Sequence, residues 1–175
     1  MITARAWAGK HYAVYGLARS GLATVRALLA SGARVTAWDE REEAREALLP
    51  SPSGEGRAVG ESTGSLTARP HPSIPSPEGE GRLEIAPLDD LTPFDSLVVS
   101  PGVPLNTHPL AARAREVGLE IIGDIELFAR ARLELPPHKV VGITGTNGKS
   151  TTTALVHHIL KTAGVPTTMG GNIGL

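Results

Sequence analysis

The residues best suited to chemistry lie in a glycine-rich loop near the end of the 175-residue chain. Segment 142–151 reads GITGTNGKST, follows a short apolar run and precedes a helical pattern. Its backbone N–H groups are suited to surround an anion, and Lys149 adds a positive charge for the β- and γ-phosphates of a nucleoside triphosphate. Ser150 offers a hydroxyl to Mg²⁺. We predict that ATP and Mg²⁺ bind through Gly145, Thr146, Asn147, Gly148, Lys149, Ser150, Thr151 and Thr152.

This loop departs at one position from the usual pattern G-x-x-x-x-G-K-[ST]. The first glycine of that pattern falls at Ile143, and Gly142 and Gly145 flank it. The alternative interpretation is a Gly-Lys helix start without a ligand. The strand–loop–helix context favours binding of a nucleoside triphosphate.

A second glycine loop, segment 16–21, follows an apolar run near the amino terminus. It reads G-x-A-x-x-G, with Ala18 in place of the glycine that lets the backbone approach a pyrophosphate. Asp39 ends the next apolar run, where dinucleotide-binding folds place an acidic contact to ribose. Two interpretations stay open: a phosphate-bearing ligand at the helix N-terminus, assisted by Arg19 and Ser20, or a tight turn without a ligand. The missing glycine favours another nucleotide over NAD or FAD.

Alternating apolar runs and amphipathic segments must position both loops. Runs typical of buried strands occupy 11–15, 34–38, 83–86, 95–100, 119–122 and 140–144. Helical patterns occupy 19–30, 40–49, 109–117, 124–133 and 149–163. The alternation predicts an α/β fold, with a Rossmann-like parallel sheet covered by helices on both faces and then the start of a P-loop α/β domain. A Pro-Pro pair marks the boundary, so we expect domains at 1–135 and 136–175.

Glycine and proline are concentrated in residues 50–82, which contain 6 of each. This segment has no aromatic residue, and its few apolar residues follow neither a helical nor a strand period. Such a composition buries too little surface to offset the entropy of ordering. We expect a disordered surface insertion in the first domain.

Composition excludes several classes of protein. The chain has no cysteine, which excludes a disulfide scaffold and a thiolate zinc site. The net charge of −1 gives no electrostatic footprint for nucleic acid, and no apolar run has the length of a membrane span. We expect a soluble, cytoplasmic protein without nucleic-acid or membrane partners. His108 lies in a proline-rich stretch, and we expect it to be solvated.

Six segments resemble the Mur ligase family. They are GITGTNGKSTTT at 142–153, GGNIGL at 170–175, SPGVP at 100–104, GDIELF at 123–128, and YGLARSGL at 15–22 together with WDER at 38–41. The resemblance covers the chain except for the insertion. It is strongest to the family member that adds D-glutamate.

The resemblance implies an ATP- and Mg²⁺-dependent ligase of peptidoglycan synthesis. ATP would phosphorylate the carboxylate of UDP-N-acetylmuramoyl-L-alanine, and the amine of D-glutamate would attack the acyl phosphate. Lys149 would have the catalytic role of neutralising charge on the transferred phosphoryl group. The UDP-sugar would contact Gly16, Arg19, Ser20, Asp39, Arg41, Ser100, Pro101, Gly102 and Asn172.

The family has three domains, so the resemblance further implies that the chain is an N-terminal fragment that is inactive alone. Two alternatives remain. One is a non-catalytic module for a uridine nucleotide or NAD. The other is a P-loop ligase of the folylpolyglutamate synthase type, against which the GDIELF segment and the preceding nucleotide-binding domain argue.

Overall fold

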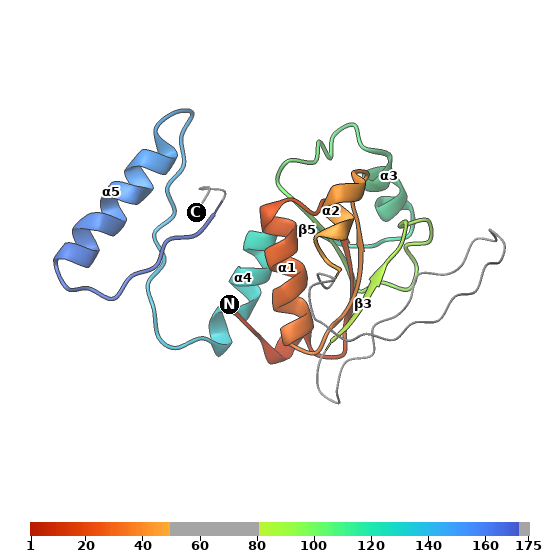
Figure 1. Ribbon diagram of the computed structural model, residues 1–175, viewed down its shortest axis with the longest axis horizontal. Helices are drawn as coiled ribbons and strands as arrows, with labels where there is room; N and C mark the ends of the chain where they lie inside the picture. The colour runs from red at the N-terminus through yellow and green to blue at the C-terminus, as the bar shows by residue number, and fades with distance from the viewer. Residues whose placement is uncertain (50–80, 172–175) are drawn as a thin grey trace, which may run out of the picture. The chain divides into compact units, whose positions relative to one another are not determined.

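The computed structural model describes residues 1–49 and 81–171. It divides into two compact units, Met1–Glu134 and Leu135–Leu175, each of which is described by itself (Figure 1). The expected insertion at 50–82 lies, up to residue 80, outside the described residues.

Unit 1 is built on a five-stranded parallel sheet, which confirms the predicted Rossmann-like α/β fold. The strands stand in the order β3-β2-β1-β4-β5. Their bounds are β1 His11–Tyr15, β2 Arg34–Trp38, β3 Arg82–Ile85, β4 Ser96–Val99 and β5 Ile121–Ile122. The chain order reverses beside β1, where β2 and β4 flank it on either side. In doubly wound sheets such a reversal opens a crevice at the carboxyl ends of the strands.

Helices cover both faces of this sheet. Their bounds are α1 Arg19–Ala30, α2 Glu42–Glu46, α3 Pro109–Glu116 and α4 Asp124–Ala131, with 3₁₀ turns η1 Arg5–Trp7 and η2 Arg132–Glu134. Helices α1 and α4 lie side by side in Figure 1 and pack with one face, whereas α3 packs with the other.

Strand β1 shows why two cores form. Successive side chains of a strand point to opposite faces of the sheet. Tyr12 and Val14 pack in the core beneath α1 and α4, and Ala13 and Tyr15 pack in the core beneath α3. All four side chains are buried, which accounts for the continuous apolar run in the sequence.

Helix α2 is shorter than the predicted 40–49. The Arg41 N–H donates to Asp39 Oδ1 at 3.0 Å, and the Arg45 guanidinium donates to the carbonyl oxygens of Asp39 and Glu40 at 2.7 and 3.1 Å. These bonds hold residues 39–41 in a turn, so the helix begins only at Glu42.

The predicted insertion, 50–82, extends two residues too far at its carboxyl end. Arg82 begins β3, and the Gly81 N–H donates to Leu29 O at 2.8 Å. A Cβ at Gly81 would lie 2.2 Å from Ala33 O, so a glycine is needed where this backbone meets the end of α1. Helix α4 also stops before the predicted Leu133, because the chain tightens into η2.

Glu134 ties the two ends of unit 1 together. Its carboxylate accepts hydrogen bonds from the N–H groups of Arg5 and Ala6, at 2.6 and 2.9 Å. These donors open η1, whose first N–H groups have no partner within the turn. The contact fixes the amino-terminal segment beside the last residue of the unit.

Unit 2 contains α5, Lys149–Thr162, preceded by an extended segment. The prediction of a strand at 140–144 is wrong, because these residues form no strand in the described structure. Val140 and Val141 are 48% and 71% exposed. A parallel strand needs a neighbour to complete its hydrogen bonds, and the described residues 135–171 contain no other strand.

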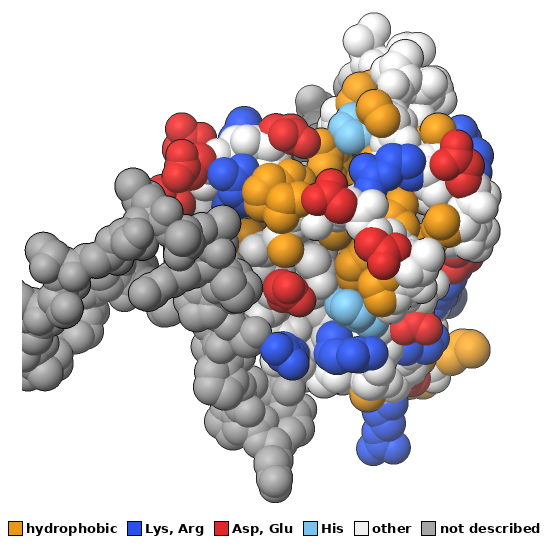
Figure 2. Space-filling model, turned by 90° about the vertical axis from the view of Figure 1, so that its right-hand side faces the viewer, with side chains coloured by type: hydrophobic (Ala, Val, Ile, Leu, Met, Phe, Trp, Pro, Cys, Tyr) orange, Lys and Arg blue, Asp and Glu red, His pale blue; other side chains and the backbone are white. Residues whose placement is uncertain are grey.

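On the face shown in Figure 2, acidic and basic side chains are interspersed among hydrophobic ones. This mixture agrees with the net charge of −1. None of the helices in the described part of the chain is long and apolar enough to cross a membrane.

Candidate nucleotide-binding loops

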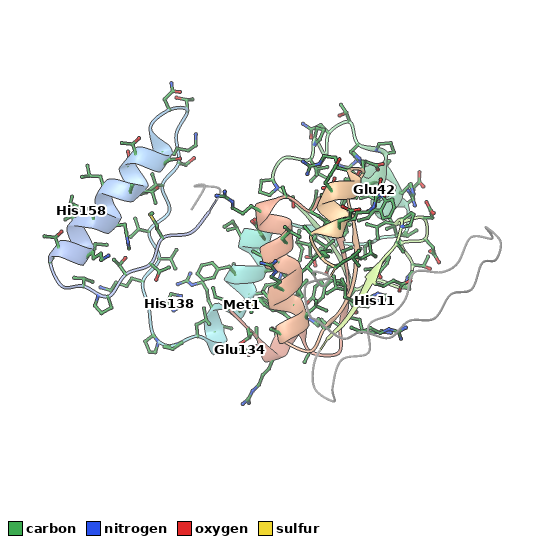
Figure 3. All side chains as sticks on the ribbon, viewed as in Figure 1. Met1, His11, Glu42, Glu134, His138 and His158 are labelled. Atoms are coloured by element: carbon green, nitrogen blue, oxygen red, sulfur yellow. The ribbon has the colours of Figure 1, made fainter. Side chains whose placement is uncertain are left out.

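The first glycine loop lies at the carboxyl edge of the unit 1 sheet. Figure 3 shows His11, at the start of β1, and Glu42, at the start of α2, at opposite ends of the sheet. Gly16 follows β1, and Ser100 follows β4. The Ser100 N–H donates to Tyr15 O at 3.0 Å, so the two loops leave the sheet together. The structure thus places these two predicted site residues side by side.

The loop is closed by packing as well as by hydrogen bonds. Ser100 Oγ donates to Gly16 O at 2.6 Å. A Cβ at Gly21 would lie 1.9 Å from that same carbonyl oxygen and 2.8 Å from Ser100 Oγ. Gly21 is therefore required for the close approach of α1 to the end of β1, whether or not a ligand binds.

The amino end of α1 faces this loop without a side-chain cap. Ala18 is the N-cap residue and makes no side-chain hydrogen bond, and Arg19 and Ser20 open the helix. The first N–H groups of a helix lack intrahelical partners and attract anions. Pro101 and Gly102 form an exposed turn after β4.

The carboxylate of Asp39 accepts its hydrogen bonds from donors of the protein itself. Only 7% of this residue is exposed, and its Oδ2 accepts a hydrogen bond from the Leu17 N–H at 2.7 Å. Oδ1 accepts from Arg41 Nε at 3.1 Å and from the Arg41 N–H at 3.0 Å, and Oδ2 also accepts from Arg41 Nη2 at 3.2 Å. Four hydrogen bonds fill the capacity of a carboxylate. Asp39 thus anchors the first glycine loop through Leu17.

Burial alone would raise the pKa of Asp39, but the hydrogen bonds from Arg41 and Leu17 outweigh it and hold that pKa below its ordinary value. The carboxylate is therefore ionised at neutral pH. Arg41, predicted as a ligand contact, has its guanidinium on Asp39 in this structure.

Sequence reasoning missed a hydrogen-bonded group at the same edge. The Tyr15 hydroxyl donates to Glu40 Oε1 at 3.0 Å and lies 2.9 Å from His108 Nε2. Burial, and next the Glu40 hydrogen bond, raise the pKa of Tyr15 to about 12. His108 is half-buried and not solvated as expected, because its Nδ1 accepts from the Leu110 N–H at 3.3 Å and caps α3.

One feature of the sequence indicates this helix cap. Proline is favoured at the first position of a helix, and Pro109 stands there directly after His108. The partners of His108 could not have been found in this way, because Tyr15 lies 93 residues away in sequence.

The second glycine loop, in unit 2, is open. Gly148 is the N-cap of α5 in the left-handed region, with φ of +73°. A Cβ there would meet no atom within 4 Å. Lys149 Nζ donates to the carbonyl oxygens of Gly145 and Thr146, at 2.6 and 3.2 Å, so its charge lies over the loop.

These residues fit a triphosphate and its metal. The hydrogen-bond ladder of α5 starts with the Thr152 N–H, donated to Gly148 O at 2.9 Å. The N–H groups before it in the first turn have no intrahelical acceptor. Asn147, Ser150 and Thr151 are exposed around the same turn. Asn172, predicted to contact the sugar, lies outside the described residues.

Within residues 1–49 and 81–171, no three or more His, Cys, Asp or Glu side chains form a metal-binding cluster. A magnesium ion at the second loop would therefore depend on the Ser150 hydroxyl and on oxygens of the phosphate ligand.

Comparison with known proteins identifies close relatives. The chain is 60% identical to a protein of Sphingopyxis alaskensis and 57% identical to one of Novosphingobium aromaticivorans. A protein of Zymomonas mobilis is 50% identical. Each is named UDP-N-acetylmuramoylalanine--D-glutamate ligase, and each similarity covers 100% of this chain. The chain is homologous to these ligases.

The matched part of each relative is limited: 34%, 33% and 36% of its length, respectively. The chain thus spans about a third of the length of the curated relatives it matches. No protein-family model matches the chain. The predicted resemblance to a D-glutamate-adding ligase is confirmed by the three relatives.

Proposed function

We propose that the chain serves an ATP-dependent ligase that joins D-glutamate to UDP-N-acetylmuramoyl-L-alanine in peptidoglycan synthesis. The observation that carries the proposal is identity of 50–60% over the whole chain to proteins of that name. The two glycine loops, each at the start of a helix, supply chemistry suited to a UDP-sugar and to ATP.

Unit 1 binds the UDP part of the substrate at the carboxyl edge of its sheet. The first turn of α1, with Arg19 and Ser20, takes the diphosphate. Gly16, Ser100, Pro101 and Gly102 line the same edge, and Arg41 and Asp39 stand at the end of β2. Asp39 acts there by holding the Leu17 N–H and the Arg41 guanidinium in position. Asn172 is assigned to the muramoyl end of the substrate.

Unit 2 binds ATP through residues 145–152. Lys149 leaves the carbonyl oxygens of its own loop and pairs with the phosphates, whose negative charge is a better partner. Ser150 takes part in holding Mg²⁺, and the N–H groups of the first turn of α5 surround the β-phosphate. Thr151 and Thr152 extend this turn.

The chemical role of these residues is electrostatic. ATP supplies a phosphoryl group that converts the substrate carboxylate to an acyl phosphate, and the amine of D-glutamate displaces phosphate to form the amide. Lys149 holds its positive charge where the transferred phosphoryl oxygens gain negative charge. The effect requires a cation held close to those oxygens, and the place of Lys149 at the start of α5 supports this role.

Calorimetric titration of the 175-residue chain with UDP-N-acetylmuramoyl-L-alanine, UDP and NAD tests the assignment of unit 1. We expect the two uridine ligands to bind and NAD not to bind. The variant Arg19→Met should weaken UDP binding about tenfold, because it removes a charge-assisted contact to the diphosphate. Arg26→Met, an exposed arginine of the same helix away from its amino end, is the matched control. NAD binding without a response to UDP would overturn the proposal.

A further inference from the structure

Asn147 of the second glycine loop is the one asparagine of the chain that a glycine follows, and both residues lie open to solvent. Asn147 is exposed, and a Cβ built on Gly148 would meet no atom within 4 Å. Among the described residues, the side-chain amide of Asn147 has no hydrogen-bond partner. Neither packing nor a hydrogen bond from these residues therefore fixes this side chain.

The main-chain nitrogen of Gly148 lies directly after this amide. Gly148 is the N-cap residue of α5, and its carbonyl oxygen accepts from the Thr152 N–H at 2.9 Å. Within the part of the chain that the structure describes, the Gly148 N–H itself has no acceptor. This agrees with its place at a helix start, where N–H groups lack intrahelical partners. An amide carbon and a nitrogen able to attack it are thus neighbours in the chain.

Asn106 offers a comparison within the same chain, because it is exposed as well. The residue after it, Thr107, donates its N–H to Pro104 O at 3.0 Å. Thr107 is also β-branched, so its side chain crowds its own main-chain nitrogen. Attack by that nitrogen first requires a hydrogen bond to break, whereas attack by the Gly148 nitrogen requires no such step.

We propose that Asn147 is a modification site, at which the side-chain amide is lost by reaction with the neighbouring main chain. The Gly148 nitrogen forms a bond to Cγ of Asn147, and the bond from Cγ to Nδ2 breaks. Nδ2 leaves as ammonia, with the proton of the Gly148 N–H, and a cyclic imide remains. Water then opens one of the carbon–nitrogen bonds of the ring, which leaves an aspartate or an isoaspartate at position 147. Water is consumed and ammonia is released, so the reaction needs no oxidant or reductant.

The modification puts a negative charge into the loop to which we assign ATP, so its effect on binding rests on the proposed function. A carboxylate replaces a neutral amide and repels the phosphates. Bound ATP in turn slows the reaction, because the N–H groups at the start of α5 then donate to phosphate oxygens. A Gly148 nitrogen held in this way is not free to attack. Modification and ATP binding therefore compete for the same N–H group.

Incubation of the 175-residue chain at mildly alkaline pH, followed by proteolysis at acidic pH and mass spectrometry, measures conversion at each asparagine. We expect Asn147 to convert about tenfold faster than Asn106 or more, the factor that corresponds to one hydrogen bond of ordinary strength. Asn147→Gln keeps a side-chain amide but lengthens the side chain, so the ring forms poorly and we expect no conversion at that position. A peptide of residues 142–151 gives the rate without the fold.

Conversion at Asn147 in the folded chain at a rate close to that of the peptide would support the inference. Equal rates at Asn147 and Asn106 would overturn it. It would also be overturned if Asn147 stayed intact in the folded chain while it converted in the peptide, because the loop would then protect the amide.

Two further measurements connect the site to ATP. Saturating ATP with Mg²⁺ should slow conversion at Asn147 about tenfold and leave Asn106 unaffected. Calorimetric titration should show ATP binding weakened about tenfold or more in the converted chain and in Asn147→Asp, whereas Asn147→Gln should keep its own starting affinity through the incubation. Conversion without protection by ATP would contradict the assignment of ATP to this loop and leave the modification site standing.

Discussion

The two glycine loops look alike in sequence, yet their glycines are explained by different physical causes. In unit 1, a side chain at Gly21 would collide with the Gly16 carbonyl oxygen at 1.9 Å. In unit 2, a side chain at Gly148 would meet no atom within 4 Å, and glycine is favoured there by the positive φ of +73°. Gly21 of the first loop is required by packing, whereas Gly148 of the second loop is favoured by its backbone conformation alone.

The difference extends to the charged groups beside each loop. Asp39 is buried and is bonded to the first loop and to Arg41. Lys149 is exposed, and among the described residues its ammonium group bonds only with carbonyl oxygens of its own loop. A charge that is committed to protein partners stabilises the fold, whereas one that can exchange weak partners for phosphate is available for binding. The charged group beside the first loop therefore serves structure, whereas the one beside the second loop, as we propose, binds a ligand directly.

The largest expected effect is on the stability of unit 1. Gly21→Ala should lower its free energy of unfolding by about 3 kcal/mol or more, because the methyl group forces α1 away from β1. Tryptophan fluorescence during urea unfolding measures this, since Trp7 and Trp38 are both in unit 1. Gly148→Ala should leave that transition unchanged. Equal stability of Gly21→Ala and the unsubstituted chain would remove the contrast between the loops.

The next largest effect is on the affinity of the second loop for ATP. Lys149→Met should weaken binding of ATP with Mg²⁺ by roughly ten- to a hundredfold, through loss of charge-assisted contacts to phosphate. Calorimetric titration gives the affinity. Lys161→Met, in the last turn of the same helix, is the control. An unchanged ATP affinity in Lys149→Met would show that the open loop is not the triphosphate site.

A smaller effect tests the structural use of Asp39. Its pKa is lowered in the folded state, so its ionised form stabilises unit 1 above the unfolded pKa of about 3.9, and this stabilisation is lost as the pH falls through the folded pKa. Asp39→Asn should cost about 2 kcal/mol at pH 7. The difference from the unsubstituted chain should narrow below about pH 4. Urea unfolding across this pH range measures it, and a difference independent of pH would contradict the role of the charge.

The smallest effect lies where the amino-terminal segment meets the end of unit 1, near the labelled Met1 and Glu134 in Figure 3. Glu134→Ala removes the acceptor for two N–H groups and should cost about 0.5–1 kcal/mol, as for other helix caps. Glu116→Ala, an exposed glutamate of α3, is the control. Faster hydrogen exchange at Arg5 and Ala6 is expected only in the first variant, and unchanged exchange would argue against the cap.

Much of the fold could be predicted because strands and helices in unit 1 follow local patterns. The bounds of β1, β2 and α1 agree with the prediction, since their apolar residues pack within the same unit. Segment 140–144 has an equally apolar pattern and forms no strand. A pattern states which residues suit a strand, but the strand itself needs a neighbour with which to pair.

The candidate site was predictable to a different degree in each loop. Lys149 and the start of α5 are local features, so the sequence places them together. Asp39 was expected as a ligand contact, but its partner Leu17 lies 22 residues away and leaves it no open acceptor position. The tertiary structure also brings the Tyr15 hydroxyl to the carboxylate of Glu40, a contact that no local pattern indicates.

The sequence by itself determined the alternation of strands and helices, the two glycine loops and the resemblance to a ligase family, because each depends on neighbouring residues. Only the tertiary structure decided that Gly21 is required by packing, that Asp39 is occupied, and that His108, Tyr15 and Glu40 are bonded. Those facts depend on contacts between segments far apart in sequence. Packing of the sheet and its helices fixes such contacts, and no local pattern encodes them.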